Sequence, residues 1–200
     1  MRNGLPLALP GMRIGLLGGS FDPAHEGHVN ITEEALRAFD LDRVWWLVTP
    51  GNPLKQHGPA PLPQRVAQAR KILTDPRAIV TDIEARLGTR MTADTIAALQ
   101  MLYPGVRFVW LMGSDNLVQF HLWDRWKEIA DRVPIGVLAR PGSRLAARNS
   151  VTARMLQRWR LPESQAAGLA LRHPPAWVLI NQPMSKMSST ALRLARKAKK

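Results

Sequence analysis

The chain has 200 residues, of which 28 are Lys or Arg and 15 are Asp or Glu, giving a formal net charge of +13 at pH 7. This length favours one domain with its own core, and the lack of cysteine excludes a disulfide-stapled scaffold. No apolar run approaches the ~18 residues of a membrane span, and residues 5–10 are too short and proline-rich for a signal peptide. We therefore expect a cytoplasmic protein with no membrane partner, a loose leader over residues 1–11, and a single domain over residues 12–200.

The positive charge is concentrated in the last third of the chain. Residues 140–200 hold 13 Lys and Arg against the single acid Glu163, whereas the first 139 residues hold 15 basic and 14 acidic groups. Such a surface attracts polyanions, but no RNA-binding signature and no array of stacking aromatics accompanies it. We expect the charge to steer small anionic substrates, and nucleic-acid binding on a nucleotide-binding fold remains an alternative, not the main role.

Strands and helices are expected to alternate along the chain, because short apolar runs alternate with apolar residues at helical spacing. The strands are expected at residues 12–17, 43–48, 78–83, 106–112, 134–139 and 177–181. The helices are expected at residues 29–39, 64–73, 93–103 and 150–159, with another capped by Ser114 or Asp115 and a last one from Ser188 onward. This order predicts an α/β, Rossmann-like, doubly wound and mainly parallel sheet in a single domain. Ligands of such a sheet bind at the carboxyl ends of its strands.

Residues 18–28, Gly-Gly-Ser-Phe-Asp-Pro-Ala-His-Glu-Gly-His, join the first expected strand to the first helix. The N–H groups at a helix start attract anions, and Gly18 and Gly19 let the backbone approach a ligand closely. His25 and His28 are three residues apart, so they share a face of a helical turn, and each can donate a hydrogen bond to phosphate. A zinc site is the alternative, but it needs three or four ligands, and the chain has no cysteine and only three other histidines. The segment therefore indicates phosphate binding.

A second anion site is indicated near the C-terminus by the run Ser-Ser-Thr-Ala-Leu-Arg over residues 188–193. Ser188 and Ser189 are favoured N-cap residues ahead of a helix-forming run. Thr190 and Arg193 lie three apart, so a hydroxyl and a guanidinium share one face, and the guanidinium can bind phosphate through two hydrogen bonds. By itself this run would be an ordinary capped helix with a solvated arginine; the first motif favours the anion site.

These two runs are similar to the signatures of nucleotidylyltransferases of the α/β-phosphodiesterase type, and most closely to their nicotinate-mononucleotide adenylyltransferase branch. The resemblance implies a Rossmann-like fold and transfer of the adenylyl group of ATP to nicotinate mononucleotide, giving deamido-NAD and pyrophosphate in NAD biosynthesis. It implies that Mg²⁺ arrives with ATP and that the protein itself holds no metal. Nicotinamide mononucleotide or another phosphomonoester is the alternative acceptor. Nothing in the sequence indicates an oligomeric state.

The resemblance also implies an ATP site. His25 and His28 would be the catalytic residues and would hold the α- and β-phosphates. Asp115 would bind the ribose, although it could equally be a helix cap. The proline-rich loop of the family is shorter here and lacks its histidine, but it keeps Lys55 for the triphosphate. The remaining ATP-binding residues would be Gly18, Gly19, Ser20, Phe21, Gly113, Ser188, Ser189, Thr190 and Arg193.

The acceptor pocket departs further from the family pattern. Its Ser-Tyr-Thr run is replaced by Arg90-Met91-Thr92, which keeps only the threonine. Trp123 stands where the family places an aromatic ring against the pyridine, whereas the strand tryptophans Trp45, Trp46 and Trp110 are expected in the core. The residues implied for nicotinate mononucleotide are Asn52, Lys55, Met91, Thr92, Trp123 and Arg140.

Overall fold

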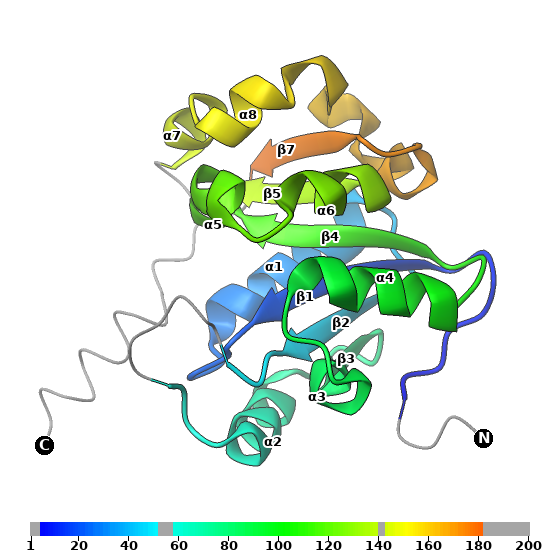
Figure 1. The fold of residues 1–200 in the computed structure, drawn as a ribbon, viewed down its shortest axis with the longest axis vertical. Helices are drawn as coiled ribbons and strands as arrows, with labels where there is room; N and C mark the ends of the chain where they lie inside the picture. The colour runs from blue at the N-terminus through cyan, green and yellow to red at the C-terminus, as the bar shows by residue number, and fades with distance from the viewer. Residues whose placement is uncertain (1–4, 52–57, 140–142, 182–200) are drawn as a thin grey trace, which may run out of the picture.

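The computed structural model describes residues 5–51, 58–139 and 143–181. Within these ranges the chain forms a seven-stranded sheet in the order β3-β2-β1-β4-β5-β7-β6 (Figure 1). Every neighbouring pair of strands is parallel, which confirms the predicted parallel α/β fold. The strands are Arg13–Gly19 (β1), Arg43–Val48 (β2), Ala78–Thr81 (β3), Arg107–Gly113 (β4), Ile135–Ala139 (β5), Arg160–Leu161 (β6) and Trp177–Asn181 (β7).

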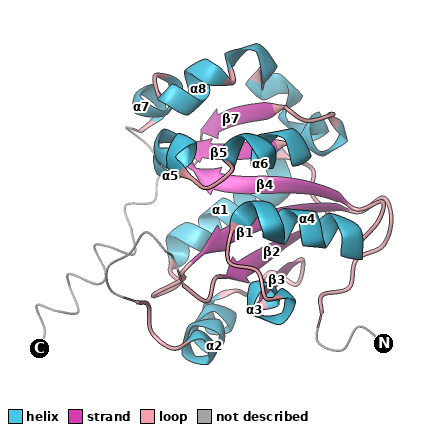
Figure 2. Ribbon diagram, in the orientation of Figure 1, coloured by secondary structure: helices cyan, strands magenta, loops and turns pink. Residues whose placement is uncertain are grey.

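Helices cover both faces of the sheet, with α4, α5 and α6 in front and α1 behind in the view of Figure 2. In the described part of the chain, none is long and apolar enough to cross a membrane. The α-helices are Glu26–Ala38 (α1), Leu62–Ile72 (α2), Ile83–Leu87 (α3), Thr92–Leu102 (α4), Ser114–Gln119 (α5), Trp126–Arg132 (α6), Arg144–Arg148 (α7) and Val151–Met155 (α8). Short 3₁₀ helices cover Phe120–Leu122 (η1), Gln157–Trp159 (η2) and Glu163–Leu171 (η3).

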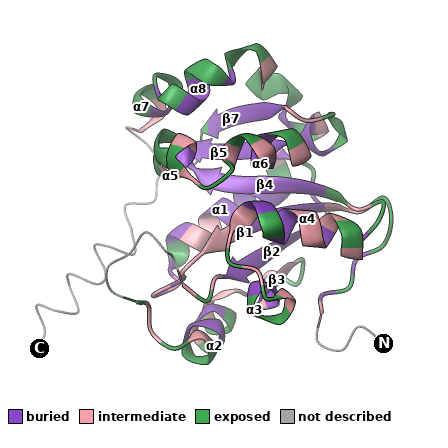
Figure 3. Cartoon of the chain, viewed as in Figure 1, coloured by how far each residue is buried: buried purple, intermediate pink, exposed green. Residues whose placement is uncertain are grey.

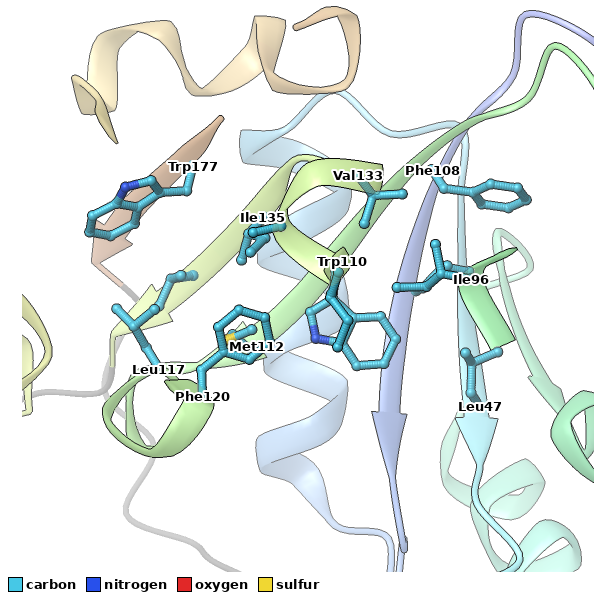
Figure 4. Packing of buried hydrophobic residues seen from close by; sticks show 14 of the residues in the cluster. Leu47, Ile96, Phe108, Trp110, Met112, Leu117, Phe120, Val133, Ile135 and Trp177 are labelled. Carbon is cyan, nitrogen blue, oxygen red and sulfur yellow. The ribbon is translucent and has the colours of Figure 1, made fainter. Parts of the chain in front are cut away.

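Two apolar cores lie on the two faces of the sheet, because side chains alternate between faces along each strand. On β4, Trp110 and Met112 pack with α4 and α5 residues such as Ile96 and Leu117 (Figure 4). Leu111, between them, belongs to the other core, which α1, α2 and η3 cover. The strands are accordingly buried while the outer helix surfaces are exposed (Figure 3).

The tryptophans of the strands are core residues, as predicted. Trp45 and Trp46 are completely buried, and Trp110 is almost so. Trp45 lies in the core under α4, whereas Trp46 lies in the core under α1. Burying side chains of this size is a major source of stability, about 1.5–3 kcal/mol for even a smaller apolar side chain.

Several predicted boundaries are wrong. The expected strand over residues 78–83 ends at Thr81, and Ile83 begins α3, where its side chain is fully buried. The expected helix over residues 150–159 is divided into α8 and η2, after which the two-residue strand β6 follows directly. A strand this short shows no periodicity, so only its pairing with β7 defines it.

Residues 5–11 are held against the domain, which contradicts the expected loose leader over this segment. The hydroxyl of Tyr103 donates to the carbonyl oxygen of Pro6 at 2.7 Å, and the amide of Gly11 donates to the carbonyl of Gly105 at 2.8 Å. Ala8 is buried in the core that α4 covers. Residues 1–4 lie outside the described ranges.

Gly136 on β5 supplies a test of this packing, because a Cβ there would lie 2.5 Å from Cε2 of Phe39, a ring that is fully buried. We expect Gly136→Ala to lower the free energy of unfolding by about 1–3 kcal/mol, the usual cost of overpacking a core. Urea denaturation measures the change. Gly168→Ala is the control, because a Cβ there meets nothing within 4 Å; equal stability losses in the two variants would contradict the packing.

Candidate active site

The carboxyl ends of β1 and β4 bring part of the predicted site to one edge of the sheet. Leu17 of β1 pairs with Leu111 of β4, so the glycine-bearing ends of these two strands, Gly19 and Gly113, finish side by side. The strand order reverses between β1 and β4, since β2 and β3 lie on one side and β5, β7 and β6 on the other. Ligands of open parallel sheets bind in the crevice at such a switch point.

His25 and His28 form a reciprocal capping box at the start of α1. The Nδ1 atom of His25 accepts from the amide of Gly27 at 3.0 Å, and Nδ1 of His28 accepts from the amide of His25 at 3.2 Å. An imidazole nitrogen that accepts carries no proton, so the ring N–H of each histidine lies on Nε2. The cap thus fixes the tautomer that makes each Nε2 a donor.

Aromatic packing holds these two rings in place. Their centroids are 4.0 Å apart, and the ring of Phe21 lies 4.7 Å from that of His28 and stacks on Trp46 at 4.8 Å. Phe21 has a φ of +47°, which is costly for a bulky residue, and it is nearly fully buried. The packing of its ring on Trp46 and His28 offsets the backbone strain.

A chain of hydrogen bonds ties the histidine-bearing turn to the sheet. Trp46 on β2 donates from Nε1 to the hydroxyl of Thr32 at 2.7 Å, and this hydroxyl donates to the carbonyl of His28 at 2.9 Å. Thr32 is completely buried on α1. The position of His28 is therefore set by β2 as well as by its own helix.

Gly18 and Gly19 are the last two residues of β1, not a turn after the strand as predicted, and protein side chains pack closely against both. A Cβ on Gly18 would lie 2.6 Å from Cη2 of Trp110, and one on Gly19 would lie 3.3 Å from the ring of Phe21. Trp110 in turn meets Trp123 edge to face, with ring centroids 6.2 Å apart. The part-buried Trp123 is thereby joined through one indole ring to Gly18 at the end of β1.

The start of α4 lies beside the segment that carries Trp123. Met91 is the N-cap of this helix and Thr92 its first residue, one position earlier than predicted. Asp94, in the first turn, would oppose the positive end of the helix dipole, but it forms an ion pair with Arg125 at 2.6 Å. Both side chains are exposed, so we expect this pair to offset the charge of Asp94 without adding much stability.

The helix α5, which directly follows β4, is capped differently from the prediction. Gly113 is the N-cap of α5, and neither Ser114 nor Asp115 caps it. A Cβ on Gly113 would lie 2.5 Å from Oδ1 of Asp115, so the carboxylate occupies the space that glycine leaves open. Ser114 is buried and shares a 2.6 Å hydrogen bond with Ser143, which follows β5. Asp115 is exposed at the sheet edge, where a ribose could reach it.

The remaining predicted site residues lie outside the described ranges, so their positions are not part of this structure. They are Asn52, Lys55, Arg140, Ser188, Ser189, Thr190 and Arg193. In the described part of the chain, no group of three or more His, Cys, Asp or Glu side chains could hold a metal ion.

Two buried charged residues near this edge were not predicted, Arg65 and Glu84. Arg65 lies on the buried face of α2, one turn before Ala69, and this spacing is the one sequence signal that could have found it. Glu84 on α3 is only 5% exposed, and its Oε1 accepts from the hydroxyl of Thr95 on α4 at 3.3 Å. Burial raises the pKa of Glu84 to about 7, although hydrogen bonds from Thr49 and Thr95 act the other way.

Glu84 should make the stability of the protein depend on pH. Its pKa is higher folded than unfolded, so the folded state binds the proton more tightly, and its contribution to stability is lost as pH rises from about 4.5 to about 7. We expect Glu84→Gln to gain stability relative to the wild type between pH 5 and pH 8, by up to about 3 kcal/mol. Thermal unfolding across that range measures it. Glu33→Gln, at an exposed position on α1, is the control; parallel pH profiles for Glu84→Gln and the wild type would contradict the expectation.

Comparisons with known proteins agree with this geometry. The cytidylyltransferase-like family model matches residues 16–195. A "probable nicotinate-nucleotide adenylyltransferase" of Ruegeria pomeroyi is 59% identical over 195 residues, covering 98% of this chain and 92% of that protein. One from Cereibacter sphaeroides (strain ATCC 17025) is 63% identical over 182 residues, covering 91% and 97%.

Solved structures share the fold. The nicotinic acid mononucleotide adenylyltransferase of Plasmodium falciparum, complexed with NaAD, has a TM-score of 0.69 at 19% identity and aligns with 92% of this chain and 83% of that one. At this identity the likeness concerns the fold alone, whereas the curated relatives match in sequence over nearly their whole length. The chain therefore belongs to the nicotinate-nucleotide adenylyltransferases, within the cytidylyltransferase-like family.

Proposed function

We propose that this protein transfers the adenylyl group of ATP to nicotinate mononucleotide, releasing pyrophosphate and forming deamido-NAD. The observation that carries the proposal is the pair of imidazoles at the start of α1, both fixed with Nε2 as the donor. They stand at the switch point of the sheet, next to the close-packed end of β1 at Gly18 and Gly19. A triphosphate is the anion that such a site suits best, because N–H donors and a helix start converge there.

The reaction is a substitution at phosphorus. An oxygen of the 5′-phosphate of nicotinate mononucleotide attacks the α-phosphorus of ATP, and the bond between that phosphorus and the bridging oxygen of pyrophosphate breaks. No covalent intermediate with the protein is needed, so catalysis consists of positioning and of stabilising the developing negative charge. Nε2 of His25 and of His28 would donate to the α- and β-phosphate oxygens, and His28 would stabilise the charge that grows in the transition state.

The leaving pyrophosphate requires further cations. From their motifs we propose Lys55 and Arg193 for this role, together with Ser188, Ser189 and Thr190, where the sequence predicts a helix start. Mg²⁺ is proposed to enter with ATP; it neutralises charge on the triphosphate and keeps water and substrate oxygens as ligands. This suits the few carboxylates of the described site, of which Asp115 is instead assigned to the ribose.

The acceptor is proposed to lie between the start of α4 and Trp123, with its pyridine ring against the indole. The first amides of a helix have no acceptor within it, so those at Thr92 can bind the pyridine carboxylate. Asp94 would repel a carboxylate, and its ion pair with Arg125 offsets this charge only in part, because Arg125 also pairs with Asp124 and Glu128. Asn52 and Arg140 are proposed to complete the site.

We also propose that the protein is located in the cytoplasm.

Replacing His28 tests the catalytic role. We expect His28→Ala to lower kcat by about 10²–10³-fold, the usual loss when one preorganised donor is removed. Steady-state pyrophosphate release with ATP and nicotinate mononucleotide measures it, with circular dichroism to check the fold. His173→Ala, at an exposed position far from the turn in sequence, should keep wild-type activity. A loss below tenfold in His28→Ala would remove His28 from the mechanism.

Substrate preference tests the acceptor pocket. Backbone donors at the start of α4 pair with a carboxylate, whereas a carboxamide leaves its own N–H groups unpaired. We expect kcat/KM for nicotinate mononucleotide to exceed that for nicotinamide mononucleotide by at least ~10-fold, about 1.4 kcal/mol. Initial rates with the two mononucleotides at fixed ATP give the ratio. Equal values would leave adenylyl transfer in place but refute the carboxylate pocket.

A further inference from the structure

Arg65 is a buried arginine whose hydrogen bonds, among the described residues, all go to backbone carbonyl groups. It lies in the first turns of α2 and is 1% exposed. Nε donates to Ala60 at 2.6 Å, Nη1 to Ser20 at 2.6 Å and to Thr49 at 2.9 Å, and Nη2 to Pro50 at 3.2 Å. One guanidinium therefore joins three separate segments of the chain.

Two of these segments leave the carboxyl ends of the central strands. Ser20 directly follows Gly19, the last residue of β1, and Thr49 and Pro50 directly follow β2. The amide of Thr49 also donates to the carbonyl of Gly19 at 3.1 Å, so the two loops touch where Arg65 binds them. The first loop leads to His25, and the second leads to the residues proposed for the triphosphate and the acceptor.

The four acceptors named above are neutral carbonyl groups, so none of them neutralises the charge of Arg65. Burial lowers its pKa, and the negative charge of Asp22, in the phosphate-binding loop, partly opposes that effect. A buried cation is costly unless it is hydrogen-bonded, and the four carbonyl groups meet that need. A cation held in this way adds positive potential close to the glycine turn, where water screens it less than at the surface.

We propose that Arg65 is a positioning residue for adenylyl transfer. Its planar, forked guanidinium fixes the backbone of the β1 loop relative to that of the β2 loop, and its charge favours the triphosphate beside Ser20. Lysine cannot reproduce this arrangement, because its three donors diverge from one nitrogen. The assignment rests on the proposed function, since both loops carry residues of that reaction.

Three variants separate positioning from stability. Arg65→Met removes the fork and the charge, Arg65→Lys keeps the charge, and Val66→Ala weakens the packing of the same helix at a neighbouring core residue. Misplacement of a binding loop by about 1 Å can cost 10²-fold in rate. We therefore expect Arg65→Met to raise KM for ATP by at least ~10-fold and to lower kcat, and Arg65→Lys to raise KM by about 3–10-fold. Val66→Ala should lower Tm while KM stays within about twofold of the wild type.

Kinetics, thermal unfolding and calorimetric titration with a non-hydrolysable ATP analogue are measured on the same preparations. Wild-type KM and kcat in a folded Arg65→Met, or in Arg65→Lys if Arg65→Met does not fold, would overturn the proposal. An equal rise of KM in Val66→Ala would also overturn it, because any loosening of α2 would then suffice. If the wild type does not adenylate nicotinate mononucleotide, the proposed function fails separately, and the affinities of the variants for the ATP analogue still decide the role of Arg65.

Discussion

The reciprocal hydrogen bonds between His25 and His28 are the constraint on which the site depends. Each ring uses Nδ1 to accept from a backbone amide of the helix start, which leaves Nε2 as the donor. The same two bonds satisfy amides that would otherwise lack a partner at the beginning of α1. Helix initiation and the proposed phosphate recognition thus rely on one pair of side chains, and a change in either ring is expected to disturb both.

Side chains on both faces of the sheet pack against the candidate site. Trp46 lies under α1, where it stacks on Phe21 and, through Thr32, holds the carbonyl of His28. Trp110 lies on the opposite face, where it closes against Gly18 and Trp123. Gly18 and Trp123 thus rest on the same indole, so the proposed ATP side and the proposed acceptor side share the core that contains Trp110. A change of packing around Trp110 is therefore expected to affect both sides.

The sequence predicts the elements that depend on local pattern. The bounds of β2 and β7 match the expected residues 43–48 and 177–181, because each is a short apolar run between clear breaks. The histidine pair was found from its spacing, but its capping role was not, since histidine is not among the favoured N-cap residues. Arg65 and Glu84 were missed for a related reason. A charged residue in a helix is normally solvated, and only the tertiary structure shows that these two are buried against strand-end loops and a neighbouring helix.

The parallel sheet also governs when the site comes into existence during folding. Parallel neighbours need a long crossover connection, so none of the strand pairs is local in sequence. β1 can pair with β2 once α1 has formed, but its other neighbour is β4, and Arg13 pairs with the distant Arg107. During synthesis the phosphate turn therefore emerges early, while one edge of β1 stays open until β4 has left the ribosome. A nascent chain that ends before β4 has the histidines but lacks the strand on the other side of the switch point, so the proposed site cannot form until β4 has joined the sheet.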